Sequence, residues 1–115
     1  RFEFVQGTVC SSALVGSLLD RCDAVVHMAA ETHVPRSILD NHAFFDTDVM
    51  GTQVVATQAS MRGGRLDRLL HVSTSEVYGT AAYAPMDEAH PLEPTTPYAA
   101  AKCGADRLVA AFVKT

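Results

Sequence analysis

Apolar residues come in short unbroken runs that alternate with stretches where they recur at helical spacing. Residues 24–30 and 68–73 are such runs, a pattern that favours strands buried on both faces, as in a parallel sheet. Residues 2–6, where an acidic side chain alternates with aromatic ones, predict a further strand. Strands that alternate with helices predict βαβ units, so we expect an α/β fold.

Helical spacing predicts a short helix over residues 11–20 and one long helix, or two abutting ones, over residues 37–61. Leu39 and Met50 belong to the apolar stripe of the long element. The region rich in proline and acidic residues that follows the second run is expected to be a loop, over residues 80–94.

The final helix is expected to begin at Thr96 and Pro97. Threonine is a frequent N-cap, and the fixed φ of proline suits the first helical position. Its core face would carry residues that recur at spacings of three and four, namely Ala101, Ala105, Leu108 and Phe112.

The composition is that of one globular domain or part of one: 115 residues, 48% hydrophobic and 19% charged. The net charge of −4, without a basic cluster, argues against a nucleic-acid partner. No apolar run approaches the ~20 residues of a membrane span. The cysteines Cys10, Cys22 and Cys103 lack Cys-x-x-Cys spacing, so we expect reduced thiols in a cytoplasmic protein and no zinc site.

Tyr98 and Lys102 are the first candidates for chemistry. Residues four apart on a helix share one face, with Cβ atoms about 5–6 Å apart. A lysine cation beside a phenol favours the phenolate, so such a tyrosine can act as a base. The spacing also arises often by chance, and on its own it carries little weight.

Polar or small residues close both apolar runs. Ser73, Thr74, Ser75 and Glu76 stand at the end of the second run, and ligands of open α/β sheets bind at the carboxyl ends of strands. The alternative for these hydroxyls is a turn with a helix cap. The small residues within 28–33, at the end of the first run, would let a flat ligand approach the backbone, or a helix pack closely.

Taken together and in this order, the Ala-Ala strand end, Ser-Thr-Ser-Glu and Tyr-x-x-x-Lys resemble the extended short-chain dehydrogenase/reductase family of NAD-dependent epimerases and dehydratases. The likeness covers essentially the whole chain and is closest to nucleotide-sugar 4,6-dehydratases. Residues 27–38 resemble the dTDP-glucose enzymes, whereas 73–81 and 85–92 look more like the 4,6-dehydratases of nonulosonic acid pathways.

The resemblance implies a Rossmann-type doubly wound parallel sheet with strand order 3-2-1-4-5-6. Residues 1–115 would be the central part of its NAD(P)-binding domain and carry the third, fourth and fifth strands. The glycine-rich pyrophosphate turn, the first two strands and the C-terminal substrate domain are not in this sequence. We therefore expect a gene product longer at both ends, of which this part does not fold alone.

The resemblance also implies catalytic roles. Tyr98 would take the proton of the sugar 4-hydroxyl while hydride passes from C4 to NAD⁺, and Lys102 would hold the nicotinamide ribose. Thr74 would hydrogen-bond the reacting hydroxyl. Glu76 would remove the C5 proton before water leaves from C6, and the hydride returns to C6.

Further family contacts follow from the same likeness. Thr32 and Thr74 would touch the substrate. The residues expected at NAD are Thr8, Val9, Ala29, Ala30, Glu31, Thr32, Thr47, Ser73, Tyr98 and Lys102.

Three positions depart from the family's pattern. Ser75 is expected to be catalytic. It stands where dTDP-glucose dehydratases carry an Asp that acts as the acid on the leaving hydroxyl, whereas dehydratases of GDP-mannose resemble this sequence in having Ser. Thr8 replaces an adenine-binding Asp, and Asp48 replaces an Asn.

Two other enzymes of the family remain alternatives. A 4-epimerase needs Tyr98, Lys102 and Thr74 but not Glu76, and a UDP-uronate decarboxylase shares the Thr-Ser-Glu run. A non-catalytic nucleotide-binding scaffold is a further alternative. The expected partners are a nucleotide-diphosphate sugar and a second copy, in a homodimer formed through helices 37–61 and 97–114.

The histidines are assigned by their surroundings. His27 and His71 lie in predicted strands, so we expect them to pack in the core and not to bind metal. His42 and His90 are expected to be solvated, and His33 follows the cofactor segment, where it would lie near substrate.

Overall fold

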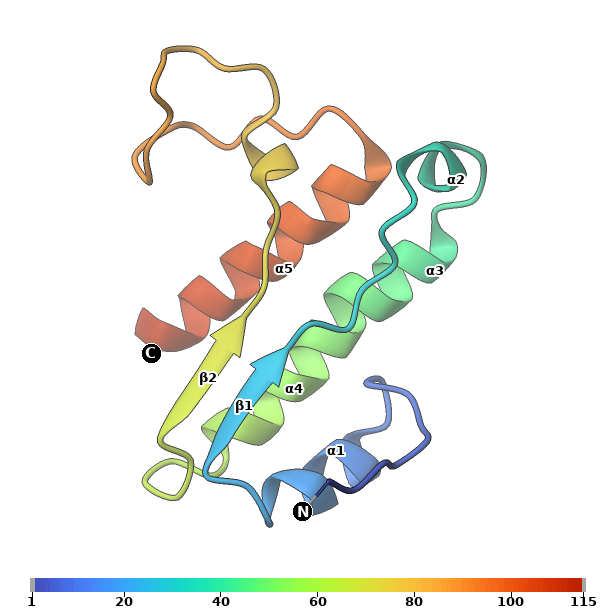
Figure 1. Cartoon of the computed structure of the whole chain (residues 1–115), viewed down its shortest axis with the longest axis vertical. Coiled ribbons are helices and arrows are strands. Elements are labelled where there is room, and N and C mark those ends of the chain that lie inside the picture. Colours follow the sequence, from blue (N-terminus) through green and yellow to red (C-terminus); the bar gives the residue numbers. More distant parts are fainter. Residues whose placement is uncertain (1, 115) are drawn as a thin grey trace.

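The computed structural model describes residues 2–114, with two parallel strands lying over a layer of helices (Figure 1). In chain order the elements are α1 (Ser12–Leu19), β1 (Ala24–His27), α2 (Val34–Leu39), α3 (His42–Phe44), the π-helical η1 (Phe45–Gly51), α4 (Thr52–Ser60), β2 (Arg68–His71), the 3₁₀-helical η2 (Ser75–Tyr78) and α5 (Pro97–Lys114).

The two strands pair in parallel, with Ala24 opposite Arg68 and His27 opposite His71. The helices that connect them complete a βαβ unit, which confirms the expected α/β class. Both strands end earlier than predicted, at His27 and His71. Beyond these residues the segments diverge toward α2 and η2 (Figure 1), and the Val72 N–H still donates to the His27 carbonyl (3.1 Å).

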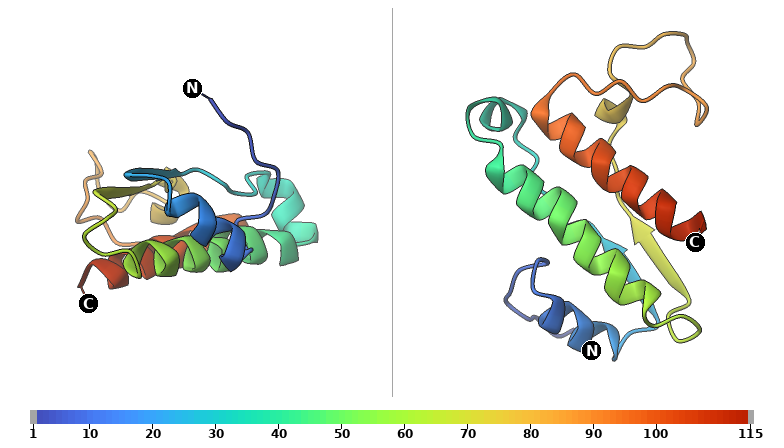
Figure 2. Two further views of the ribbon diagram at one scale, coloured as in Figure 1. Left: turned by 90° about the horizontal axis from the view of Figure 1, so that it is seen from below. Right: turned by 180° about the vertical axis from the view of Figure 1, so that it is seen from behind.

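Helices α1, α4 and α5 lie on the same face of the sheet (Figure 2). Val25 and Leu69 point toward them and pack against the cluster between α1 and α4. On the opposite face Val26 is 59% exposed and Leu70 53% exposed. The expectation of strands buried on both faces is therefore wrong within residues 2–114, because no described helix covers that side.

The predicted strand over residues 2–6 is absent from the described chain. Phe2 and Phe4 are exposed, and the segment pairs with neither β1 nor β2. Alternating side chains make a strand only when a neighbouring backbone satisfies the N–H and C=O groups. This absence fits the family's strand order, which puts two strands between this segment and β1.

The helix predicted over residues 37–61 is divided. Asp40 has extended dihedrals (φ −147°, ψ 103°), and its carboxylate accepts a hydrogen bond from the His42 N–H (3.3 Å), so one helix ends there and the next begins. Leu39, expected on the buried stripe, is consequently exposed, and so is Met50 on η1. The π-helical turn was not expected; such widened turns are common near functional sites.

Helix α5 begins and buries its face as the sequence predicts. The Thr96 hydroxyl accepts a hydrogen bond from the Ala99 N–H (3.1 Å), which makes it the expected cap. Ala101 and Ala105 are fully buried. No helix of residues 2–114 is long and apolar enough to cross a bilayer.

Candidate active site

Tyr98 and Lys102 lie on the buried face of α5, with 7% and 4% of their surfaces exposed. The Tyr98 ring packs edge-on against Phe44, with centroids 6.3 Å apart and an interplanar angle of 73°. The Tyr98 N–H donates to the Ser37 hydroxyl (3.2 Å). Within residues 2–114 the phenol hydroxyl itself donates no hydrogen bond, so the side chain is held by its ring and backbone.

Lys102 joins α5 to the end of β2. Its ammonium group donates a hydrogen bond to the Val72 carbonyl (2.7 Å). Burial lowers the pKa of Lys102 from its usual value, while the carboxylates of Asp48 and Asp106 oppose that change. An ammonium has three N–H donors, so this contact leaves others for a ligand.

The segment after β1 is anchored by Asp48 on η1. The Asp48 carboxylate, 1% exposed, accepts a hydrogen bond from the Glu31 N–H (2.8 Å), and its other oxygen is buried without a partner. Burial raises the pKa of Asp48; the Glu31 N–H and Lys102 act in the opposite direction. Ala29 is exposed and Ala30 half-buried, so the backbone here is open to a ligand.

The other residues expected at NAD lie on three separate segments. Thr32 is exposed and precedes α2, while Thr47 is half-buried on η1 beside Asp48. Val9 lies against Gly51, where an added Cβ would approach its Cγ2 to 2.5 Å. The hydroxyl of Thr8 accepts from the Cys10 N–H (3.2 Å) and so serves its own turn.

The hydroxyl residues after β2 divide between two roles. The Thr74 hydroxyl accepts a hydrogen bond from the Glu76 N–H (3.3 Å) and caps η2, so the capping alternative is realised. The Ser73 hydroxyl is buried without a partner. Ser75 and Glu76 are exposed at the start of η2.

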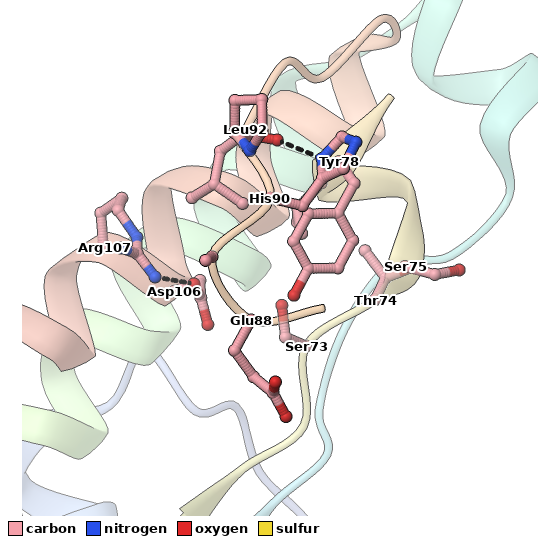
Figure 3. A pocket seen from close by; sticks show the side chains of 12 residues that line it. Ser73, Thr74, Ser75, Tyr78, Glu88, His90, Leu92, Asp106 and Arg107 are labelled. Carbon is pink, nitrogen blue, oxygen red and sulfur yellow. Dashed lines mark hydrogen bonds and ion pairs between the residues drawn. The ribbon is translucent and has the colours of Figure 1, made fainter. Parts of the chain in front are cut away.

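A cavity of about 710 Å³ lies beside these hydroxyl residues (Figure 3). Tyr98 and Lys102 do not line it. Helix α5 contributes Asp106 and Arg107 instead, which lie at least one turn after Lys102. The structure therefore brings Ser73, Thr74 and Ser75 together at the cavity, whereas the Tyr–Lys pair lies outside its lining and is joined to the same strand end by the bond from Lys102 to Val72. Other lining residues come from η2 and the loop before α5: Val77, Tyr78, Glu88, Ala89, His90, Pro91 and Leu92.

His90 lines this cavity and is buried, although the sequence predicts it in solvent. It is 4% exposed, its Nε2 accepts a hydrogen bond from the Ala82 N–H (2.9 Å), and its ring packs against Tyr78 and Tyr83. The expectation is wrong because the 80–94 loop folds back on itself around this ring. No local pattern marks a histidine that is buried by its own loop.

The two strand histidines are packed as expected. Their rings are 5.4 Å apart, and His27 Nε2 is 2.9 Å from the Thr52 hydroxyl. Burial, with smaller effects of His71 and Lys102, lowers the pKa of His27 from 6.5 to about 4. Burial also lowers the pKa of His71, whose ring nitrogens have no partner. Both rings are therefore neutral at physiological pH.

The remaining histidines lie at the surface. His42 forms an exposed pair with Asp46 (3.0 Å), as its predicted solvation requires. His33 caps α2, because its Nδ1 accepts a hydrogen bond from the Arg36 N–H (3.2 Å). Among residues 2–114 no group of three or more His, Cys, Asp or Glu side chains is placed to hold a metal ion.

A parallel βαβ unit with hydroxyl and small residues at its strand ends, beside a helix that carries a buried Tyr–Lys pair, defines a Rossmann-type α/β protein. The chain belongs to the GDP-mannose 4,6 dehydratase family, whose model matches residues 1–115. The resemblance to NAD-dependent epimerases and dehydratases is thereby confirmed.

Named relatives agree with this assignment. A dTDP-glucose 4,6-dehydratase of Actinoplanes sp. is 45% identical over 115 residues, which are 100% of this chain and 35% of that protein. A crystal structure of the dTDP-glucose 4,6-dehydratase DesIV from Streptomyces venezuelae, with NAD and TYD bound, superposes with a TM-score of 0.94 and 43% sequence identity. The match covers 100% of this chain and 35% of the DesIV chain. The chain thus spans about a third of the length of these relatives.

A more distant structure shares the fold. The Bordetella bronchiseptica enzyme WbmG, in complex with NAD and UDP, is 30% identical with a TM-score of 0.82, over 92% of this chain and 33% of that one. Both of these similar structures therefore contain NAD together with a nucleotide.

Proposed function

We propose that this chain is the central part of the NAD-binding domain of a nucleotide-sugar 4,6-dehydratase, and that it carries the catalytic residues. The observation that carries the proposal is the bond from Lys102 to the Val72 carbonyl. It joins the Tyr–Lys helix to the strand end that bears Ser73, Thr74, Ser75 and Glu76. The names of the relatives support the same reaction type.

The residues present fit NAD. The exposed Ala29 and half-buried Ala30 leave a flat ligand access to the backbone, and Lys102 keeps donors for ribose hydroxyls. The buried Ser73 hydroxyl and the second Asp48 oxygen are polar atoms without partners, as expected beside a polar ligand. When bound, NAD⁺ accepts the hydride from sugar C4 and returns it to C6.

In the proposed reaction, Tyr98 takes the O4 proton as C4 is oxidised, and Thr74 hydrogen-bonds that oxygen. Glu76 then takes the C5 proton, which the 4-keto group has acidified. The proton that Tyr98 took from O4 passes through the Ser75 hydroxyl to the 6-hydroxyl, which leaves as water. Glu76 returns its proton to C5 when hydride reaches C6. The product is a 4-keto-6-deoxy sugar. Thr32 borders the substrate, while Thr8, Val9, Glu31 and Thr47 complete the proposed NAD contacts.

The test is turnover by the complete gene product of a panel of dTDP-, GDP- and UDP-hexoses. A dehydratase yields a 4-keto-6-deoxy sugar, which is identified by mass (loss of water) and by the carbonyl carbon in NMR. Interconversion of 4-epimers without loss of water would establish the epimerase alternative, and loss of CO₂ from a uronate the decarboxylase. No turnover of any sugar, together with NAD binding, would favour the scaffold.

A homodimer formed through residues 37–61 and 97–114 is part of the proposal. Helices α4 and α5 lie side by side and show their outer faces on the same side of the molecule (Figure 2). Exposed Phe45, Met50 and Val113 add apolar surface to that layer. We expect a dimer mass in light scattering. A cytoplasmic location is proposed as well, in line with three free thiols.

A further inference from the structure

The buried hydroxyl of Ser37 connects two segments that are 61 residues apart in sequence. Ser37 lies on α2, is fully buried, and donates a hydrogen bond to the Val34 carbonyl (2.7 Å) in its own helix. The same oxygen accepts the hydrogen bond of the Tyr98 N–H (3.2 Å) at the start of α5. Both roles of the hydroxyl are thus used inside the protein.

The first turn of α5 shows why this contact matters. The first N–H groups of a helix have no partner within the helix. Pro97 has none to satisfy, the Ala99 N–H is capped by the Thr96 hydroxyl (3.1 Å), and the Ala100 N–H reaches the Thr96 carbonyl (2.8 Å). Tyr98 is the one first-turn residue here whose N–H is satisfied from a different element.

The contact also links the two halves of the proposed site. Helix α2 directly follows the segment that ends in Thr32, and its cap is His33. Helix α5 carries Tyr98. A hydroxyl that bridges α2 and the Tyr98 backbone therefore determines how far the phenol lies from the segment after β1, and Phe44 holds the ring from the side.

We propose that Ser37 is a positioning residue for Tyr98: by hydrogen-bonding the Tyr98 backbone, it sets the place of the phenol relative to the β1 segment where the sugar and NAD would bind. The inference rests on the proposed function. Loss of the hydroxyl leaves a buried N–H unpaired, and a displacement of about 1 Å of a reacting group lowers turnover by about 100-fold.

The test compares Ser37→Ala with Ser17→Ala in the complete gene product. Ser17 is a matched control, since its hydroxyl also donates to the carbonyl three residues earlier (Leu14, 2.8 Å) but is exposed and reaches no other element. We expect Ser37→Ala to lower kcat by about 10- to 100-fold with KM and the Kd of NAD⁺ within about threefold, whereas Ser17→Ala keeps the kcat of the unsubstituted protein.

A readout that needs no turnover accompanies the kinetics. Hydrogen exchange of the Tyr98 amide, followed by mass spectrometry of short peptides, should accelerate in Ser37→Ala and not in Ser17→Ala. If Ser37→Ala folds poorly, Ser37→Cys replaces it, because a thiol keeps the volume but is a weak donor and acceptor. It should also lower kcat while the Kd of NAD⁺ is kept.

The outcomes separate the two proposals. An unsubstituted protein that turns over no nucleotide sugar contradicts the proposed function, whatever the exchange data show. An active protein whose folded Ser37 variants keep kcat within about twofold overturns the positioning role. So does a parallel loss of kcat, NAD⁺ affinity and unfolding temperature, since that pattern marks a purely structural serine.

Discussion

The ammonium of Lys102 lies 2.7 Å from the carbonyl oxygen of Val72, just beyond the last residue of β2. This hydrogen bond thus joins the second turn of α5 to the strand end where the hydroxyl residues begin. The lysine is 4% exposed, and burial lowers its pKa. The loss of hydration therefore makes the charged form of this side chain less stable in the folded protein than in water. Such an arrangement is expected where a charge serves chemistry and not stability.

Lys102→Met should therefore separate activity from stability. We expect turnover to fall by at least about 100-fold, because the proposed contact of the ammonium with the nicotinamide ribose is lost. The unfolding free energy should change by less than about 1 kcal/mol, since the variant also removes an unfavourable buried charge. Lys114→Met, exposed on the same helix, is the control. A large stability loss with retained turnover would contradict this account.

Glu76→Gln tests the elimination step. The amide keeps the size of the side chain but cannot accept the C5 proton. We therefore expect the 4-keto-6-deoxy product to form at least about 100-fold more slowly. Oxidation at C4 does not need this carboxylate and should continue, visible as transient NADH absorbance. The exposed Glu93→Gln is the control. An unchanged rate of water loss would remove Glu76 from the mechanism.

Asp48→Asn should alter the pH dependence of stability. The pKa of Asp48 is raised in the folded state, so the ionised carboxylate weakens folding above that pKa, and the penalty vanishes below the ordinary value of 3.8. Asparagine can still accept from the Glu31 N–H. We expect about 1 kcal/mol of added stability at pH 7 and none near pH 3, measured by urea unfolding.

The control is Asp46→Asn, at an exposed position two residues earlier on η1. It should leave the free energy of unfolding nearly unchanged at pH 7 and near pH 3. A destabilisation by Asp48→Asn at pH 7 would instead mean that the attraction between Asp48 and Lys102 outweighs the burial of the carboxylate.

His27 predicts a loss of stability in mild acid. Its pKa falls from 6.5 to about 4 on folding, so the unfolded chain binds the proton more strongly. The neutral ring contributes fully to the free energy of unfolding above pH 6.5. That contribution, about 3 kcal/mol, is lost as the pH falls toward 4.

His27→Gln, which can still hydrogen-bond Thr52, should remove that component, whereas the exposed His42→Gln should keep it. Unfolding of the complete gene product is followed by circular dichroism. Equal acid sensitivity of the two variants would rule out His27 as its source.

Local sequence rules account for the elements whose causes are local. The start of α5 follows from the Thr96 hydroxyl and the fixed φ of Pro97, both of which act within one turn. The apolar runs predicted where β1 and β2 begin, and the Tyr98–Lys102 spacing put both side chains on one buried face. Those features depend on neighbours in the chain, so a single sequence suffices to determine them.

Tertiary contacts decided the rest. The Ser37 hydroxyl meets the Tyr98 N–H across 61 residues, the 80–94 loop buries His90, and Val26 is exposed because the described helices cover only the other face of the sheet. In each case the burial or partner of a side chain is set by a segment distant in sequence. Periodicity indicates which residues share a face, but only the packed structure determines what that face meets.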